Sequence, residues 1–387
     1  MPNNDAPLYT PQFLLLCLSH ILFAGSFNMI IPELPAYLSS LGGEDYKGLI
    51  IALFTLTAGL SRPFSGKLTD TVGRMPVMIF GSLVCVVCSL IYPLLSSVAG
   101  FLLLRLMHGF STGFKPTASS AYVADIAPYY RRGEAMGVLG VSMNIGSSIS
   151  PPLGSWMANV FSLDLMFYAS SGLALLSIVI LLGLRETLQD RQRMAWSSLS
   201  VSRREIIEPR ALAPAVVIAL SYLSFGAILT IVPDQSDYLG MANKGLFFTS
   251  FTAFSVLSRI VAGRMSDRFG RVPVLKVALV LSAVSLVLIG QAHTPAMLLA
   301  ASGFLGFSTG IVGPAAFAWV VDRSSDQHRG RALATAYIAL EVGIGIGALG
   351  AAWLYGNKAE NFPIAFYWTA VMALAALAYV QLAKLKG

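Results

Sequence analysis

Apolar runs of roughly 20 residues follow one another along almost the whole chain, and each is long enough to cross a bilayer as an α-helix. Of the 387 residues, 56% are hydrophobic and 12% are charged, whereas about a quarter of the residues of an ordinary soluble domain are charged. The runs lack the alternating pattern that the strands of a membrane β-barrel need. The sequence therefore predicts an all-α integral membrane protein.

Twelve such runs can be placed, and they fall into two groups of six. We expect an N-terminal six-helix bundle over 1–184 and a C-terminal six-helix bundle over 211–387, joined by a cytoplasmic linker over 185–210. The linker mixes charges, serines and Trp196, so it is predicted either as an interfacial helix or as a solvated tether. The predicted spans are 11–37, 46–67, 75–97, 99–126, 135–159, 164–184, 211–237, 245–266, 273–292, 295–321, 331–355 and 361–383.

Lysine and arginine gather in the loops on one side of the predicted helices. Because short cytoplasmic loops carry an excess of these residues, we expect that side and both termini to face the cytoplasm. The expected location is the cell membrane, that is, the inner or plasma membrane. The opposite loops carry only Lys47, Lys244 and Lys358. The net charge of +7 is therefore interpreted as a sign of topology and not of nucleic-acid binding. The basic loop residues are Arg131, Arg132, Arg185, Arg191, Arg193, Arg203, Arg204, Arg210, Arg323, Arg329, Arg331, Lys384 and Lys386.

A polar twelve-residue segment separates the second and third apolar runs at 66–77, and the same pattern recurs 197 positions later at 263–274. We call these segments the first and the second knot. Glycine permits a positive φ or close helix approach, aspartate can cap a helix start, and proline suits a first helical turn. The knots are therefore predicted to be tight turns with fixed charges. Their repeated positions are Gly66, Asp70, Gly73 and Arg74 in the first knot and Gly263, Asp267, Gly270 and Arg271 in the second.

The duplication extends beyond the knots. At the same offset Arg62 matches Arg259, Asp125 matches Asp322, and the five residues from Gly109 recur from Gly306. Each half is thus one copy of a six-helix unit. Copies with an even number of helices share one topology, so they are related by an axis along the membrane normal.

These features resemble the major facilitator superfamily of secondary transporters over essentially the whole chain. The knots are similar to its loop motif between helices 2 and 3 and between helices 8 and 9, and residues 105–109 resemble its helix 4 motif. Residues 146–155 resemble the antiporter motif of helix 5. Gly146, Pro151 and Gly154 match that motif, whereas Ser150 and Ser155 replace glycines. These two serines weaken the resemblance to drug/proton antiporters.

The resemblance implies alternating access, in which two six-helix bundles rock about a central site that opens to one side at a time. It also implies that the knot residues Asp70, Arg74, Asp267 and Arg271 help to latch the outward-open state at the cytoplasmic side. A stiff turn that anchors the cytoplasmic side is the structural alternative, and the two roles are compatible.

Six polar residues of the fourth predicted helix step by three and four, which places them on one face. Ionisable side chains inside a membrane are costly and so are candidates for function. We expect this stripe to line the transport path, with Arg105 and Lys115 attracting an anionic or zwitterionic substrate; structural pairing is the alternative. The candidate substrate-binding residues are Arg105, His108, Thr112, Lys115, Ser119, Tyr122 and, in the next helix, Asn144.

Glu341 lies about ten residues from the predicted cytoplasmic end of its helix. Since a helix rises 1.5 Å per residue, Glu341 is predicted to lie near the middle of the membrane. Burial disfavours its charged form and a nearby cation favours it, so it is our candidate for the coupling proton. Its partner in the repeat, Asn144, cannot titrate. The alternative is a structural Glu341, permanently neutral or paired with a cation such as Lys115. The secondary proton candidates are His108, Asp234 and Glu33.

Three classes of function fit these observations. The first is proton-coupled efflux of a small amphipathic or anionic compound, and the second is uptake or facilitated transport of a sugar, organic acid or other metabolite. A membrane sensor or enzyme fits poorly, because the loops offer no nucleophile with its base, no metal cluster and no P-loop. Cys85 and Cys88 lie in an apolar run and are interpreted as apolar residues. We thus expect no cofactor and no metal, with a small-molecule substrate, protons and the lipid bilayer as partners of a monomer.

Overall fold

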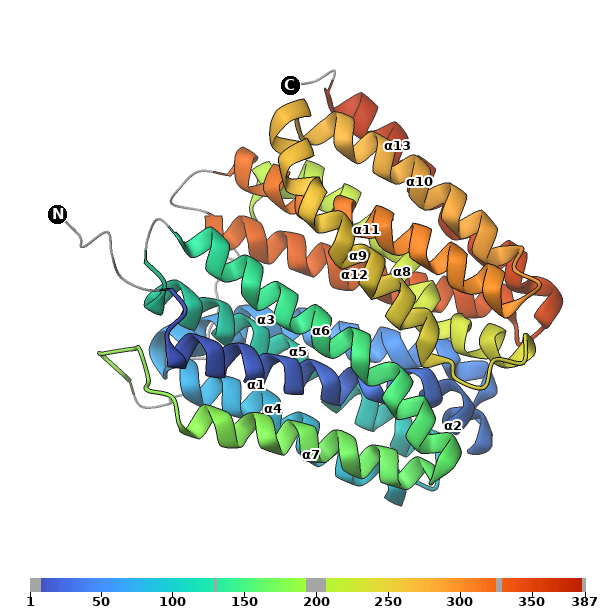
Figure 1. Ribbon diagram of the computed structural model, residues 1–387, viewed down its shortest axis with the longest axis horizontal. Helices are drawn as coiled ribbons and strands as arrows, with labels where there is room; N and C mark the ends of the chain where they lie inside the picture. Colours follow the sequence, from blue (N-terminus) through green and yellow to red (C-terminus); the bar gives the residue numbers. More distant parts are fainter. Residues whose placement is uncertain (1–7, 129–130, 193–206, 325–328, 385–387) are drawn as a thin grey trace.

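A computed structural model describes residues 8–128, 131–192, 207–324 and 329–384 (Figure 1). Within these ranges, the side chains at 260–264, 267, 329, 383 and 384 are not described. The described residues form twelve long helices, and they contain no strand. The all-α prediction is confirmed. The proposed interfacial helix of the linker falls largely on 193–206, outside the described residues.

The N-terminal half contains α1 (Pro11–Met29), the 3₁₀ turn η1 (Ile31–Glu33), α2 (Leu34–Ser40), η2 (Glu44–Tyr46), α3 (Lys47–Thr71), α4 (Arg74–Ile91), η3 (Tyr92–Leu94), α5 (Val98–Ile126), α6 (Arg132–Val160) and α7 (Leu163–Leu182). The C-terminal half contains η7 (Pro209–Ala211), α8 (Leu212–Tyr238), α9 (Gly245–Phe269), α10 (Arg271–Gly290), α11 (Pro295–Arg323), α12 (Arg329–Tyr355), η9 (Ala359–Asn361) and α13 (Phe362–Lys384).

The first predicted span, 11–37, is wrong as one continuous helix. α1 ends at Met29, and the turn η1 separates it from α2. Pro32 and Pro35 explain the break, because a proline removes a helical hydrogen bond and clashes with the preceding turn.

The first knot is only partly a turn, contrary to the prediction. Gly66 to Thr71 form the last turns of α3, and the chain reverses at Val72 and Gly73. The φ angle is 133° at Gly73 and 86° at Gly270, its equivalent in the second knot. A positive φ favours glycine, so the predicted conformational role of these two glycines is confirmed.

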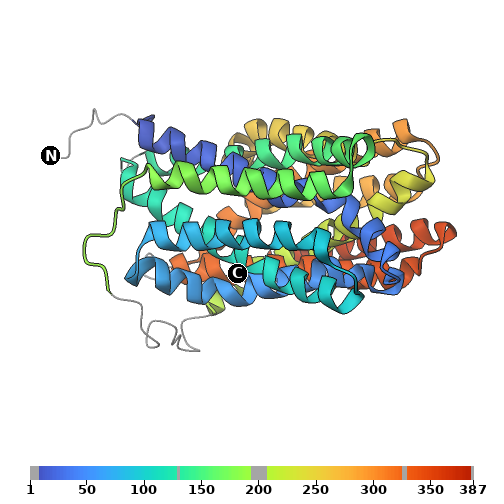
Figure 2. The same ribbon diagram turned by 90° about the horizontal axis from the view of Figure 1, so that it is seen from below.

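The helices form two bundles side by side, α1–α7 in one and α8–α13 in the other (Figure 1). Seen from below, the α1–α7 bundle lies in front of the other (Figure 2). The main contacts between the bundles are α3 against α12 and α6 against α9. The internal repeat exchanges these two contacts, because α3 corresponds to α9 and α6 to α12. We call the end with the knots and the linker the linker end, and the end with turns 41–46, 239–244 and 356–361 the far end.

Close approach between helices explains why particular glycines recur in both halves. A Cβ at Gly109 of α5 would lie 2.2 Å from the Phe54 carbonyl oxygen of α3, and a Cβ at Gly306 of α11 would lie 2.0 Å from that of Phe251 in α9. Neither position has room for a side chain. Such small-residue contacts let membrane helices pack closely.

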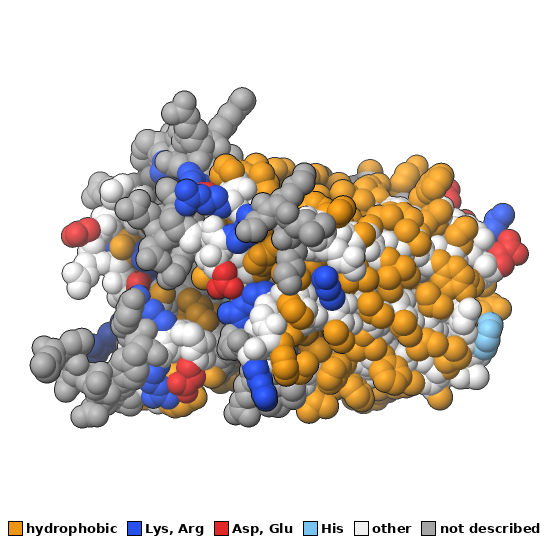
Figure 3. All heavy atoms as spheres, turned by 90° about the horizontal axis from the view of Figure 1, so that it is seen from above, with side chains coloured by type: hydrophobic (Ala, Val, Ile, Leu, Met, Phe, Trp, Pro, Cys, Tyr) orange, Lys and Arg blue, Asp and Glu red, His pale blue; other side chains and the backbone are white. Residues whose placement is uncertain are grey.

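The surface is that of a multi-pass membrane protein. Figure 3 shows a broad band of hydrophobic side chains along one flank, with lysine and arginine gathered toward the linker end. Nine helical segments of the described chain are long and apolar enough to cross a membrane, and α5, α6 and α9 are not among them. α5 carries the polar stripe, which lowers its apolar content.

Candidate functional site

A cavity of about 970 Å³ lies between the two halves. Its walls come from α1, α3, α5 and α6 on one side and from α8 and α12 on the other. Along α3 the lining extends from Ile51 to Asp70, which lies in the last turn at the linker end. This is about 28 Å of helix at 1.5 Å per residue. The cavity therefore extends from the interior to the linker end.

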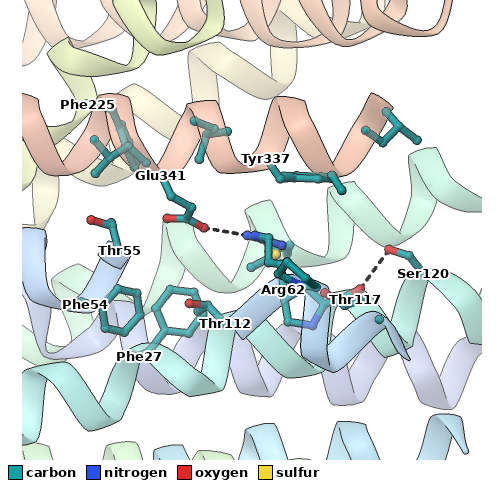
Figure 4. A pocket seen from close by; sticks show the side chains of 18 of the residues that line it. Phe27, Phe54, Thr55, Arg62, Thr112, Thr117, Ser120, Phe225, Tyr337 and Glu341 are labelled. Carbon is teal, nitrogen blue, oxygen red and sulfur yellow. Dashed lines mark hydrogen bonds and ion pairs between the residues drawn. The ribbon is translucent and has the colours of Figure 1, made fainter. Parts of the chain in front are cut away.

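Aromatic side chains from both halves line this cavity (Figure 4). Phe27 of α1 and Phe54 of α3 stack with their ring centroids 6.3 Å apart. Phe225 of α8 and Tyr337 of α12 line it from the other half. Walls of this kind suit the apolar body of an organic ligand, and the volume is that of a site for a drug-sized molecule.

An ion pair joins the two halves inside the cavity wall (Figure 4). Arg62 Nη2 of α3 lies 2.6 Å from Glu341 Oε1 of α12, and the Arg62 guanidinium lies 4.6 Å from the centre of the Tyr337 ring. Glu341 lies near the midpoint of the 27-residue α12, and its depth in the membrane stays a prediction. The alternative in which Lys115 pairs with Glu341 is wrong, because the partner is Arg62.

Arg105 of α5 reaches the same cavity although it is only 2% exposed. Its Nε donates to the Ile50 carbonyl oxygen at 2.8 Å and its Nη1 donates to the Tyr92 hydroxyl at 3.3 Å. Its guanidinium lies over the Phe54 ring, 4.6 Å from the centroid. Among the described residues no carboxylate pairs with it.

Two lysine–carboxylate pairs join the halves at the far end, and we call them the far-end gate. Lys47 of α3 pairs with Asp234 of α8. Lys244, which precedes α9, lies 3.2 Å from Glu33 of the other half. Lys47 and Lys244 are equivalent in the repeat, so the internal symmetry exchanges the two pairs. Glu33 and Asp234, which the sequence offered as secondary proton sites, are thus both engaged in this gate.

The charge of Lys244 is well supported. Burial on its own would lower the pKa of this amine, but the carboxylates of Glu33 and Asp237 raise it above its ordinary value. The Asp237 carboxylate lies 2.8 Å away, within the same half. The lysine therefore stays charged at neutral pH.

The segment that resembles the helix 5 motif packs against this gate. A Cβ at Gly154 would lie 2.2 Å from the Met29 carbonyl oxygen, and one at Gly146 would lie 2.4 Å from that of Ile21, so these glycines let α6 approach α1. Pro151 touches the second half, because a Cβ at Gly245 would lie 2.2 Å from its carbonyl carbon.

Ser155 explains one departure from the glycine pattern. Its hydroxyl donates to Glu33 Oε1 at 2.7 Å, so the serine holds a gate carboxylate. A glycine at this position could not make that bond.

Comparison with known proteins identifies the family. The family model described as Major Facilitator Superfamily matches residues 16–232 and 214–385. The chain belongs to the Major Facilitator Superfamily. It is therefore a transporter of a small-molecule substrate and not an enzyme.

Curated relatives in this superfamily include drug-resistance proteins. "Multidrug resistance protein MdtG" of Enterobacter lignolyticus (strain SCF1) is 25% identical over 409 residues, covering 99% of this chain and 94% of its own. "Multi-drug resistance efflux pump PmrA homolog" of Lactococcus lactis subsp. lactis (strain IL1403) is 27% identical over 345 residues, covering 84% of each.

Solved structures share the superfamily fold. The human organic anion transporter MFSD10 (TETRAN) has a TM-score of 0.73 at 20% identity, covering 95% of this chain and 98% of its own. A bacterial homolog of the human lysosomal transporter Spinster has a TM-score of 0.80 at 12% identity and 98% coverage of both chains. At these identities the likeness concerns the fold alone.

The superfamily knots are held within their own halves in this structure. Arg74 Nε lies 3.0 Å from Asp125, and Arg271 Nε lies 3.0 Å from Asp322. Asp70 lies 3.4 Å from Arg74 and its side chain is largely exposed. Gly263 lies within α9, and the side chain of Asp267 is not described. The Arg74–Asp125 and Arg271–Asp322 pairs each lie within one half, and the latch role stays a prediction.

The linker supplies the carboxylate that sequence reasoning missed at the first knot. Glu186 accepts the backbone N–H groups of Arg74 and Met75 at 3.0 and 2.9 Å, at the start of α4. Burial raises the pKa of this carboxyl, but the N–H groups of Leu188, Met75, Arg74 and Thr187 prevail and hold it below the ordinary value. The predicted cap, Asp70, lies in α3 instead.

The polar stripe of this transporter divides between two environments. Arg105 and Thr112 line the cavity. The expectation that the whole stripe faces it is wrong, because four members are buried within the N-terminal half. These four are His108, Lys115, Ser119 and Tyr122.

Lys115 shows how these buried residues are held. Its Nζ donates to the Ser19 hydroxyl at 3.0 Å and to the Ser177 hydroxyl, and it lies 4.7 Å from the centre of the Phe23 ring. No carboxylate of the described residues pairs with it. These partners belong to α1 and α7, so Lys115 binds neighbouring helices.

His108 and Asn144 also lie apart from the cavity lining. The two ring nitrogens of His108 lie 3.4 Å from Cys85 Sγ and 3.4 Å from the Tyr92 hydroxyl. Asn144 Nδ2 is buried and has no hydrogen-bond partner in the described structure. Its neighbours Met143 and Ser147 do line the cavity. A substrate-binding role for Asn144 stays a prediction.

Proposed function

We propose that this protein is a secondary transporter that exports small amphipathic or anionic compounds by alternating access, driven by protons that enter as the compound leaves. Efflux is favoured by the relatives, which are named for drug resistance and efflux. The linker end faces the cytoplasm in this proposal, since that is where lysine and arginine gather. The structure then corresponds to an inward-facing state, with the cavity reaching the cytoplasm and the far-end gate closed.

The observation that carries the proposal is the Arg62–Glu341 pair. It spans α3 and α12, the two helices that form one of the main contacts between the halves, and it forms part of the cavity wall. A proton on Glu341 would remove the charge that Arg62 attracts, and it would thereby weaken a bond between the halves. Protonation and the rocking motion are coupled through this contact.

Burial and pairing act on Glu341 in opposite directions. Burial penalises its charge, whereas the guanidinium at 2.6 Å favours it. When the halves rock, the separation from Arg62 and the access of water both change. Glu341 therefore takes up a proton in one state and releases it in the other, which is what coupling requires.

Transport in proteoliposomes tests the proposal. The probes are naphthalenesulfonate, naphthalenesulfonamide and naphthyltrimethylammonium, which share a ring system and differ in charge. We expect an acidic vesicle interior to drive inward accumulation of at least one probe by transporters in the inverted orientation, and a protonophore to abolish it. Accumulation only when the outside is acidic would contradict efflux and favour proton-coupled uptake.

Glu341→Gln separates coupling from binding, because it keeps the shape and cannot ionise. We expect gradient-driven accumulation to fall to background while probe exchange without a gradient persists. Glu360→Gln is the matched control, since Glu360 is exposed in η9 at the far end. Accumulation by Glu341→Gln at the rate of the unmodified protein would remove Glu341 from the mechanism.

A further inference from the structure

Arg105 is a buried cation whose charge the described protein does not balance. It is 2% exposed, and its described polar partners, the Ile50 carbonyl and the Tyr92 hydroxyl, are uncharged. Its second terminal nitrogen, Nη2, makes no hydrogen bond to the described residues. A buried charge is costly unless it is paired, so this guanidinium favours an anion from outside the chain.

The fold does not require a cation at this place. The internal repeat puts Ser302 of α11 at the position of Arg105, and Ile289 at the position of Tyr92. Ser302 is also fully buried, and its hydroxyl bonds the Leu299 carbonyl of its own helix at 2.7 Å. The second copy of the unit therefore packs without a guanidinium and without its tyrosine partner. A role in packing alone does not explain Arg105.

The surroundings fix the orientation of the guanidinium and provide room beside it. The contacts to Ile50, Tyr92 and the Phe54 ring hold it against the wall of the cavity. Phe27 stacks on Phe54 and lines the same cavity. A ligand with an anionic group on Arg105 can thus lay an apolar ring along these phenylalanines.

The described carboxylates that line the cavity do not pair with Arg105. Glu341 is engaged by Arg62 at 2.6 Å. Asp70 lies in the last turn of α3 and is within 3.4 Å of Arg74. Both carboxylates of the cavity lining thus have other arginine partners.

We propose that Arg105 holds the anionic group of the transported compound, so that the substrates are amphipathic organic anions with an aromatic or other apolar body. The proposal deepens the transport function proposed above and rests on it. A planar guanidinium offers paired N–H donors that match the oxygens of a carboxylate, sulfonate or phosphonate. Lys115, which the sequence offered as a second cation of this site, takes no part because it lies outside the cavity lining.

Equilibrium binding to the purified full chain in detergent, without a proton gradient, tests this. The unmodified protein is titrated by calorimetry with naphthalenesulfonate, naphthalenesulfonamide and naphthyltrimethylammonium. We expect the sulfonate to bind at least about tenfold more tightly than the sulfonamide, as a charge-assisted hydrogen bond predicts. Equal affinities, or a preference for the cation, would overturn the proposal without any variant having to fold.

Variants then locate the interaction. Arg105→Gln should weaken sulfonate binding about tenfold or more and change sulfonamide binding less than about twofold, whereas Arg105→Lys should retain part of the preference. Lys67→Gln is the control for the overall electrostatic potential of the cavity, because it removes a positive charge from the cavity lining near the linker end. An equal loss in Lys67→Gln and Arg105→Gln would contradict a local site.

The two proposals fail in different ways. Selective sulfonate binding without gradient-driven transport would overturn the proposed proton coupling and support the role of Arg105. Gradient-driven transport with equal affinity for all three probes would overturn the role of Arg105 and support the proposed proton coupling. If Arg105→Gln fails to give monodisperse protein on gel filtration, Arg105→Lys and the charge series on the unmodified protein decide the question.

Discussion

At the scale of single residues, the two halves differ where their chemistry differs. Arg62 recurs as Arg259, but Glu341 corresponds to Asn144. One copy of the contact between halves therefore has an arginine with a carboxylate, and the other has an arginine and an amide. Asn144 Nδ2 and Arg259 Nε are both buried without a hydrogen-bond partner among the described residues. Of these two contacts, the one between α3 and α12 thus has an ion pair, Arg62–Glu341, whose carboxylate can take up a proton.

Lys115 allows a prediction at the same scale. The repeat places Val312 at its position, and Ser19 and Ser177 can bond each other, with their hydroxyls 3.1 Å apart. Lys115→Met should therefore leave the apparent melting temperature in detergent within a few degrees of that of the unmodified protein, or raise it, because a buried amine without a carboxylate is costly. Naphthalenesulfonate affinity should not change. A large fall in melting temperature would show that the fold depends on Lys115, and a tenfold loss of affinity would show that Lys115 takes part in substrate binding; either result would contradict the prediction.

At the scale of helices, the linker end is organised by backbone groups that need partners. The first N–H groups of a helix have no partner within it, and a carboxylate there also interacts favourably with the helix dipole. The residue before α4 is Gly73, which offers no side chain. Glu186 fills this role from the linker, and Tyr122 of α5 holds the adjacent Arg185 carbonyl with a hydrogen bond of 2.8 Å. The linker is thus fastened to the first knot.

Glu186→Gln tests this fastening. Because the pKa of Glu186 is lowered in the fold, its contribution is complete above the unfolded value of about 4.3 and is lost as pH falls through the folded pKa. We expect the variant to lose about 0.5–1 kcal/mol at pH 7, a modest figure because the site is partly exposed. Thermal unfolding followed against pH should show the two proteins converging in acid. A difference that does not depend on pH would contradict a charge effect.

At the scale of the whole molecule, the internal symmetry builds the far-end gate. Lys47–Asp234 and Lys244–Glu33 are exchanged by the repeat, so both pairs must separate for the far end to open. At the linker end, the ion pairs Arg74–Asp125 and Arg271–Asp322 each lie within one half. In the proposed mechanism, the balance of bonds between the halves at the two ends sets which end is open.

Weakening the gate should therefore shift the molecule toward the other state. We expect Lys47→Gln with Lys244→Gln to lengthen the distance across the far end more than either change alone. The distance can be measured by electron spin resonance between labels on cysteines introduced at Ser40 and Lys358, since the native cysteines are all buried. Reversing both charges of one pair, as Lys47→Asp with Asp234→Lys, is the control and should keep the short distance, because the ion pair is retained. An unchanged distance in the double glutamine variant would show that these pairs do not close the far end.

Much of this architecture follows from the sequence, because hydrophobic run length and an internal repeat are local or periodic signals. The position of Glu341 near the midpoint of its helix follows from the length of one apolar run. Its partner Arg62 does not, since that contact depends on how α3 packs against α12. The cap by Glu186 was missed for the same reason, because it joins segments more than a hundred residues apart.

The stripe was misassigned because of helix geometry. At about 100° per residue, Thr112 points within about 20° of Arg105, whereas Lys115 and Tyr122 point about 80° and 100° away. Pro116, which lines the cavity, lies about 20° to the other side. A spacing of three and four residues thus defines a broad face, and only its edge faces the cavity.

In the proposed mechanism, protonation of Glu341 shifts the two halves between their states. Labels on cysteines introduced at Lys67 and Ala334, which line the cavity from opposite halves toward the linker end, report the separation of the halves as pH is varied. We predict that the distance distribution of the labelled protein titrates with pH, and that adding Glu341→Gln fixes it in the distribution found in acid at every pH. A distribution that does not depend on pH, or one that still titrates after Glu341→Gln, would contradict the account.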